Sequence, residues 1–168
     1  MTTGDEDEVD RLVDAWRRER PDLDVAPLEV LSRVTRLARH LDRARRSAFE
    51  THDLEPWEFD VLAALRRAGD PYELSPGALL TQTLVTSGTM TNRIDRLEGK
   101  GLVVRSPDPR DRRGVLVGLT ADGRQRVDAA LADLLDHERT LLASLGDRDR
   151  DQLAGLLRTL VLPFDNPA

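Results

Sequence analysis

The side chains best suited to chemistry gather at the start of a predicted helix over residues 86–100. Thr86 is a good N-cap residue, and Gly101 favours an end to the helix. The early turns carry hydroxyl, amide and guanidinium groups from Ser87, Thr89, Thr91, Asn92 and Arg96. Such groups at a helix N-terminus suit phosphates and base edges, and a bidentate Asn92–adenine or Arg96–guanine pair contributes about 1–3 kcal/mol of discrimination. We therefore predict a DNA-reading helix, although any single threonine could equally belong to a solvated face.

A basic hairpin is predicted directly after this helix. Two short apolar runs, residues 102–106 and 115–119, flank the turn-rich stretch PDPRDRRG at 107–114. An arginine at the tip of such a wing can enter a narrow, A·T-rich minor groove. We assign this role to Arg110 or Arg112. The alternative is an exposed, salt-bridged turn that does not contact DNA.

Two acidic residues lie between the arginines of the wing. We expect Asp108 and Asp111 to pair with a wing arginine and to rigidify the loop. Arg113 is nearest the second strand, so we assign it to this structural role.

Helices with one apolar face must position both features. Apolar residues with the helical period, together with capping residues, predict helices over 5–20, 27–50, 56–68, 76–83, 86–100 and 121–145, and a last helix capped by Asp147. A two-residue strand at Glu73–Leu74 would complete the sheet of the wing. The predicted fold is mainly α with a small β wing, in a single domain over 1–168 whose winged helix-turn-helix spans 55–120.

Two helical regions carry more apolar surface than a monomer of this shape can easily bury. They are residues 27–50 and 121–162, which we predict to be dimerisation helices, whereas 5–20 is an extra N-terminal helix. Pairing them would set two recognition helices about 34 Å apart, one turn of DNA. We therefore expect a homodimer on a palindromic site in double-stranded DNA.

The composition narrows the class of protein further. The net charge is −6, yet residues 75–126 hold nine basic and five acidic side chains, a local excess of +4. The absence of cysteine excludes disulfides and thiolate metal sites, and three dispersed histidines give little support for a metal centre. The N-terminus is acidic and lacks the apolar region of a signal peptide, so we expect a cytoplasmic protein. We find no nucleophile elbow, phosphate loop or Cys/His pair, and we predict no enzymatic activity and no cofactor.

The stretch SGTMTNRIDRLEGKGLVVRSPDPRDRRGVLVGLTADGR, residues 87–124, resembles the MarR family of transcriptional regulators. It is similar to that family's recognition helix, wing and the start of its first dimerisation helix. A weaker similarity extends over about 28–162. The resemblance implies a MarR-like domain in which the long helices pair, and a regulator that usually represses.

A narrower resemblance is to the PecS-like, urate-responsive branch of the family. It rests on the segment VDAWRRERPDLD at 13–24 and on four matching positions, Trp16, Asp60, Arg93 and Arg105. Urate is a planar purine anion, so it needs an aromatic wall, a guanidinium group and an acceptor for its N–H edge. The resemblance implies that these four residues bind such a ligand. An anion competing for either arginine would then move the recognition helix.

Each of these residues also has a simpler interpretation. Trp16 lies on the apolar stripe of its helix and could be a core residue, and Arg93 could read DNA directly. Asp60 sits in a mostly apolar helix, where a buried carboxylate needs a partner, and it could form a salt bridge with Arg105 in the apo state. Two other functions stay open: a MarR-type regulator of a different small aromatic or carboxylic anion, and an effector-independent DNA-binding protein.

Overall fold

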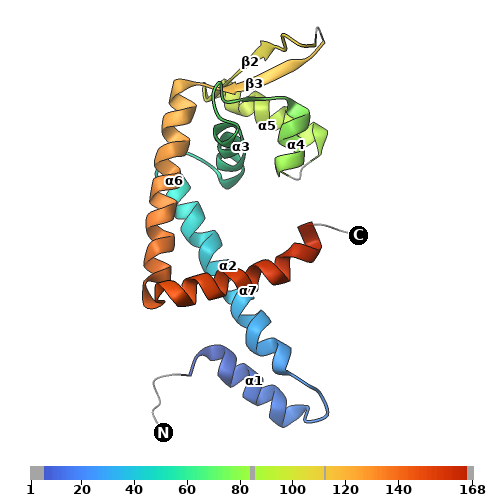
Figure 1. Cartoon of the computed structure of the whole chain (residues 1–168), viewed down its shortest axis with the longest axis vertical. Helices are drawn as coiled ribbons and strands as arrows, with labels where there is room; N and C mark the ends of the chain where they lie inside the picture. Colours follow the sequence, from blue (N-terminus) through green and yellow to red (C-terminus); the bar gives the residue numbers. More distant parts are fainter. Residues whose placement is uncertain (1–5, 84–85, 112, 166–168) are drawn as a thin grey trace. The chain divides into compact units, whose positions relative to one another are not determined.

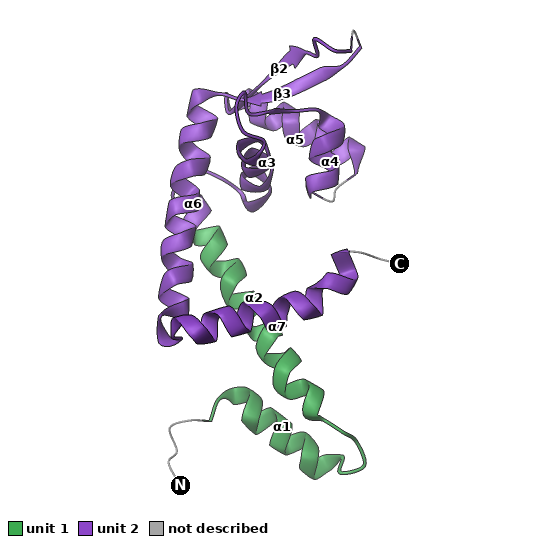
Figure 2. Ribbon diagram, in the orientation of Figure 1, with its two compact units in different colours: residues 1–47 green, residues 48–168 purple. Residues whose placement is uncertain are grey.

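The computed structural model describes residues 6–83, 86–111 and 113–165. It divides into two compact units, residues 1–47 and 48–168, which Figure 2 shows in different colours. The described part is mostly helical, with a small antiparallel sheet. This confirms the predicted fold class. None of the helices in the described ranges is long and apolar enough to cross a membrane.

The first unit contains α1 (Glu8–Glu19) and most of α2 (Ala26–Glu50). Asp7 caps α1, because its Oδ1 accepts the backbone N–H groups of Val9 at 2.7 Å and Asp10 at 3.1 Å. The helix predicted from residue 5 therefore begins three residues later, and Asp5 itself lies outside the described residues.

Ion pairs rather than a large core join α1 to α2. The buried apolar cluster of this unit consists of three valines with Leu28 packed against it. Around it, the Arg33 guanidinium contacts Asp7 at 2.9 Å and Asp10 at 2.7 Å, and Arg36 pairs with Glu8. These groups are exposed, so we expect the hairpin of α1 and α2 to be sensitive to salt and to acid.

The second unit holds the predicted recognition helix and the helices around it. They are α3 (Pro56–Arg67), α4 (Pro76–Thr83), α5 (Ser87–Gly99), α6 (Ala121–Leu141) and α7 (Asp147–Asp165). In Figure 1, α3, α4 and α5 gather beneath the wing strands, and α6 leads away from them along α3. Helix α5 matches the predicted recognition helix closely.

The sheet has three strands in the order β1-β3-β2, all antiparallel. They are β1 (Glu73–Leu74), β2 (Val103–Pro107) and β3 (Val115–Leu119). Val103 pairs with Leu119 at one end of the hairpin and Pro107 with Val115 at the other. The two-residue strand predicted from the sequence is therefore confirmed, and β2 lies one residue later than predicted.

One apolar core underlies α5 and the wing. It draws side chains from α3, α4, α5, α6, β2 and β3, and Phe49 stacks on Phe59 with ring centroids 4.1 Å apart. Gly101 adopts φ +72°, a left-handed conformation that ends α5 and turns the chain into β2. At Gly123, near the start of α6, an added Cβ would lie 2.1 Å from the Leu102 carbonyl oxygen. This close approach fixes α6 against the end of the recognition helix.

The last helices differ from the prediction at their junction. Helix α6 ends at Leu141 and is followed by a 3₁₀ turn, Leu142–Ser144. Asp147 is the first residue of α7 rather than its cap, because the Gly146 carbonyl accepts the Arg150 N–H at 3.0 Å. None of the α7 residues that the structure describes is buried in the single chain.

Candidate nucleic-acid interface

The recognition helix α5 buries one face and exposes the other. Met90, Ile94 and Leu97 are buried in the core beneath it. The residues predicted to read DNA all lie on the exposed side: Ser87, Thr89, Thr91, Asn92 and Arg96. A rigid apolar face thus holds the helix while its polar groups meet solvent, which is the arrangement that groove binding requires.

The threonines at the start of α5 also shape the local structure. Thr86 caps the helix, with its Oγ1 3.4 Å from the Thr89 N–H and 2.9 Å from the Thr89 hydroxyl. The Thr91 hydroxyl donates to the Ser87 carbonyl at 3.2 Å. Hydroxyl oxygens keep acceptor capacity after donating, so these residues can still accept a hydrogen bond from a base amino group.

Arg96 is held by two residues at the start of α3. Its Nη2 donates to Glu55 Oε1 at 2.7 Å, and its Cζ lies 4.7 Å from the centre of the Trp57 ring. The other oxygen of Glu55 accepts the Trp57 indole N–H at 2.6 Å. These two hydrogen bonds, that from Trp57 first, hold the pKa of the Glu55 carboxyl below its usual value. Arg93 lies over the same ring at 5.3 Å, and an open pocket extends from Trp57 along the early turns of α5.

A second ion pair joins the same two helices. Glu58 is completely buried, and its Oε2 accepts from the Lys100 ammonium at 2.9 Å and from the Glu55 backbone N–H at 2.9 Å. Glu58 Oε1 has no hydrogen-bond partner among the described residues. Lys100 is the only lysine of the chain and also donates to the Asp53 carbonyl at 3.3 Å. The end of the recognition helix is therefore anchored to α3 through a buried carboxylate.

The wing is organised by backbone hydrogen bonds. Asp108 Oδ1 accepts the Arg110 N–H at 2.8 Å, and Asp111 Oδ1 accepts the Arg113 N–H at 3.0 Å. We expected these carboxylates to pair with arginine side chains. In the described part of the loop they stabilise tight turns, and Arg113 contributes its backbone N–H, while pairing with a wing arginine stays a prediction. Arg110 is exposed, as its predicted role in the minor groove requires.

Arg112 and Gly114 are the remaining positions of interest in the wing loop. Arg112, the other candidate for the minor groove, lies outside the described residues. A Cβ added at Gly114 would lie 2.8 Å from the Asp108 Cβ, so the loop closes on a position that favours glycine.

Arg105 on β2 joins the wing to the recognition helix. Its guanidinium pairs with Asp95 and Glu98, both on α5, and these carboxylates, Asp95 first, raise the pKa of Arg105 above its usual value. The expected apo salt bridge from Arg105 to Asp60 is therefore wrong. Asp60 is exposed, and the buried carboxylate of α3 is Glu58, two residues earlier.

The predicted ligand residues are distributed over both units. Arg93 contacts Trp57 on one side of α5, whereas the partners of Arg105 lie on the other side of that helix, given about 3.6 residues per turn. Trp16 is on α1 in the first unit, and 48% of its surface is exposed. The expectation that it could be a core residue is thus wrong for this unit taken alone. No three His, Asp or Glu side chains in the described ranges form a group able to hold a metal ion.

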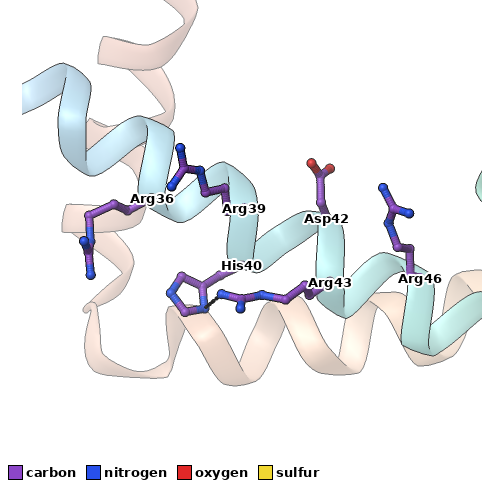
Figure 3. Close-up of a pocket in the computed structure, with 6 residues that line it drawn as sticks. All are labelled: Arg36, Arg39, His40, Asp42, Arg43 and Arg46. Carbon is purple, nitrogen blue, oxygen red and sulfur yellow. Dashed lines mark hydrogen bonds between the residues drawn. The ribbon is translucent and has the colours of Figure 1, made fainter.

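Helix α2 carries a separate basic surface. Figure 3 shows its pocket, in which Arg43 and the His40 ring are joined by a hydrogen bond of 3.1 Å. The side chains that line this pocket all come from the one helix: Arg36, Arg39, His40, Asp42, Arg43 and Arg46. Apart from the His40 imidazole, its lining offers no aromatic or apolar side chain for a planar ligand, so we assign it to the solvated face of α2.

Comparison with known proteins identifies the fold and its use. A family model described as MarR family matches residues 52–114. The HTH-type transcriptional regulator PecS of Dickeya dadantii is 37% identical over 150 residues, covering 89% of this chain and 90% of PecS. The chain belongs to the MarR family. Within it the similarity to PecS supports the PecS-like branch, and the protein is a DNA-binding transcriptional regulator rather than an enzyme.

Two solved structures extend the comparison. A cysteine-to-serine mutant of Escherichia coli MarR, complexed with operator DNA, is 28% identical with a TM-score of 0.67, covering 83% of this chain and 99% of MarR. Bordetella bronchiseptica BpsR, whose DNA binding is regulated by 6-hydroxynicotinic acid, is 30% identical with a TM-score of 0.58. This match covers 76% of this chain and 98% of BpsR.

Sequence reasoning missed Glu55, Trp57 and Glu58. All three stand at the start of α3, around the proline that opens the helix. The available signal was a tryptophan between two acids at a helix start, together with a single lysine 42 residues after Glu58. The sequence does not show that these residues meet, because their contact depends on the packing of α3 against α5.

Proposed function

We propose that this MarR-family regulator is a cytoplasmic homodimeric repressor that binds a palindromic operator and is released by urate or a similar purine anion. The observation that carries the proposal is the recognition helix α5, which exposes its polar residues beside a basic wing. Base edges would be read by Asn92 and Arg96, and Arg110 would reach a neighbouring minor groove.

Exposed apolar residues on α6 and α7 support the homodimer. Leu131 and Leu135 on α6 are exposed in the single chain, as are Leu156, Leu160 and, at 83%, Phe164 on α7. Leucines one turn apart, 131 and 135 on α6 and 156 and 160 on α7, form an exposed apolar stripe on each helix, and exposed apolar stripes mark interaction surfaces. A second copy of the chain is the partner that also places two recognition helices on one palindrome.

The surroundings of α5 support release by a planar anion. Arg93 lies over the Trp57 ring at the edge of an open pocket, so an aromatic face and a guanidinium group are available together. Arg105 ties the wing to α5, and an anion that took this guanidinium from Asp95 and Glu98 would loosen that joint. Differential binding of about 1–3 kcal/mol is enough for such an effector to shift the equilibrium.

A different aromatic anion is the second candidate effector. The pocket beside Trp57 offers stacking and positive charge, and its lining includes no carboxylate that would favour the N–H groups of a purine over a pyridine carboxylate. The similarity to BpsR, whose DNA binding responds to 6-hydroxynicotinic acid, favours this alternative for the same site. A regulator without an effector would bind DNA with the same affinity whether urate, 6-hydroxynicotinate or neither compound is present.

The experiment starts by selecting a palindrome from random duplexes and measuring its affinity by fluorescence anisotropy at fixed salt. We expect urate to weaken binding more than salicylate or 6-hydroxynicotinate do. Arg93→Ala should abolish the response, while Arg139→Ala, which removes an exposed pair with Asp136 on α6, should leave it intact. Trp16→Phe tests the predicted role of the N-terminal helix separately. A response to 6-hydroxynicotinate alone would replace urate by the second candidate, and no response at all would refute ligand release.

A further inference from the structure

Arg96, the residue predicted to read guanine, is already occupied in the DNA-free protein. Its guanidinium donates from Nη2 to Glu55 and lies over the Trp57 ring, so its charge is paired and one face of its planar group is covered. Pro56 follows Glu55 at the first position of α3 and fixes the backbone there, and the Trp57 indole N–H orients the Glu55 carboxylate. The Glu55 carboxylate is thus positioned independently of Arg96.

The pair is weak enough to be exchanged. The side chains of Arg96 and Glu55 are 51% and 52% exposed, and exposed ion pairs contribute little to stability. The buried pair of Glu58 and Lys100 anchors the same two helices, so opening the Arg96 contact leaves the attachment of α5 to α3 in place.

We propose that Glu55 is a positioning residue that holds Arg96 in a parked position, and that binding to an operator with guanine at the contacted position exchanges the Glu55 carboxylate for a base edge of DNA. The inference rests on the proposed function, because it requires Arg96 to contact the operator. A guanine that offers two acceptors to the guanidinium compensates for the lost pair, whereas a base that offers none does not. At a site without guanine Arg96 keeps its partner, so Glu55 lowers the net gain from the Arg96–guanine contact and with it the discrimination that this contact provides.

The experiment measures operator affinity at low salt for the full-length protein and four variants: Glu55→Gln, Arg96→Ala, the double variant and Asp128→Asn. The Gln side chain can still accept the Trp57 N–H, so the start of α3 should stay intact. Asp128→Asn removes one negative charge from an exposed pair with Arg66 and controls for net charge. We expect Glu55→Gln to bind a palindrome with guanine at the contacted position about two- to fivefold more tightly, the range for an exposed ion pair, and to bind a palindrome without that guanine as the wild type does. The double variant should show no gain over Arg96→Ala alone.

Each other outcome overturns the inference in a distinguishable way. If Glu55→Gln binds the operator no more tightly than the wild type while Arg96→Ala binds it more weakly, then Arg96 reads a base but Glu55 does not hold it in a parked position. An equal gain in the Arg96→Ala background, or in Asp128→Asn, would mean that Glu55 acts only through charge repulsion with DNA. If Arg96→Ala binds like the wild type, or if no variant binds DNA, the proposed reading residue or the proposed function fails together with the inference.

Discussion

Replacing Lys100 by methionine should destabilise the protein more than any other single surface change near α5. Methionine keeps most of the length and apolar surface of the lysine side chain but removes its charge. The Glu58 carboxylate, fully buried, would lose its cation and keep only the Glu55 N–H on Oε2. Its other oxygen has no hydrogen-bond partner among the described residues that could compensate.

The size of the effect follows from this burial. Removing one partner of a buried ion pair costs about 3–5 kcal/mol, because an uncompensated charge stays in the interior. The Lys100 side chain is about one-third exposed, so water can reach that end of the pair. We therefore expect a loss near the lower limit, about 3 kcal/mol at neutral pH. Glu58→Gln in the Lys100→Met background should recover much of it, since neutral groups then replace the whole pair.

Urea denaturation followed by circular dichroism, at one fixed protomer concentration, measures these free energies of unfolding. Gln125→Met, an exposed substitution on α6, is the control for adding a methionine. A loss below about 1 kcal/mol in Lys100→Met would refute the reasoning, because exposed pairs contribute no more than that. A double variant as unstable as the single variant would also contradict it.

Three further predictions follow from other contacts. Gly123→Ala should cost about 1–3 kcal/mol by pressing on the Leu102 carbonyl, and an unchanged or higher denaturation midpoint would contradict this despite the helix propensity of alanine. Hydrogen bonds from Arg33 lower the pKa of Asp7, so their contribution is present at neutral pH and is lost as the pH falls below about 4. Hydrogen exchange in α1 should accelerate there, and Arg33→Ala should remove the pH dependence; equal profiles would refute the link. Arg110→Ala should lower DNA affinity and reduce the salt slope by about 1 with unchanged stability, and unchanged affinity would exclude the contact.

Local signals predicted the recognition helix and the wing well. Thr86 and Gly101 delimit α5 in the structure as their capping preferences indicate, and two short apolar runs located β2 and β3. These features depend on residues close in sequence, so a single sequence is enough to predict them. The DNA-reading roles themselves stay predictions.

Contacts between distant segments could not be read in the same way. Nearly every position of α3 after Trp57 is buried, so the helical period does not distinguish Asp60 from Glu58 as the interior carboxylate. Likewise, Arg105 was matched to Asp60 because a buried carboxylate there would need a partner, yet Arg105 pairs with Asp95 and Glu98 of α5. In the wing, the aspartates accept backbone N–H groups of nearby residues, a local contact that the spacing of aspartates and arginines did not predict.

The most direct test is to titrate the protein onto its selected palindrome, onto one half-site and onto random duplex at physiological salt. We predict two protomers per full palindrome and an affinity at least about 10³-fold above that for random DNA, with most of this ratio lost in Asn92→Ala. Binding of one protomer with equal affinity for all three duplexes would contradict the account.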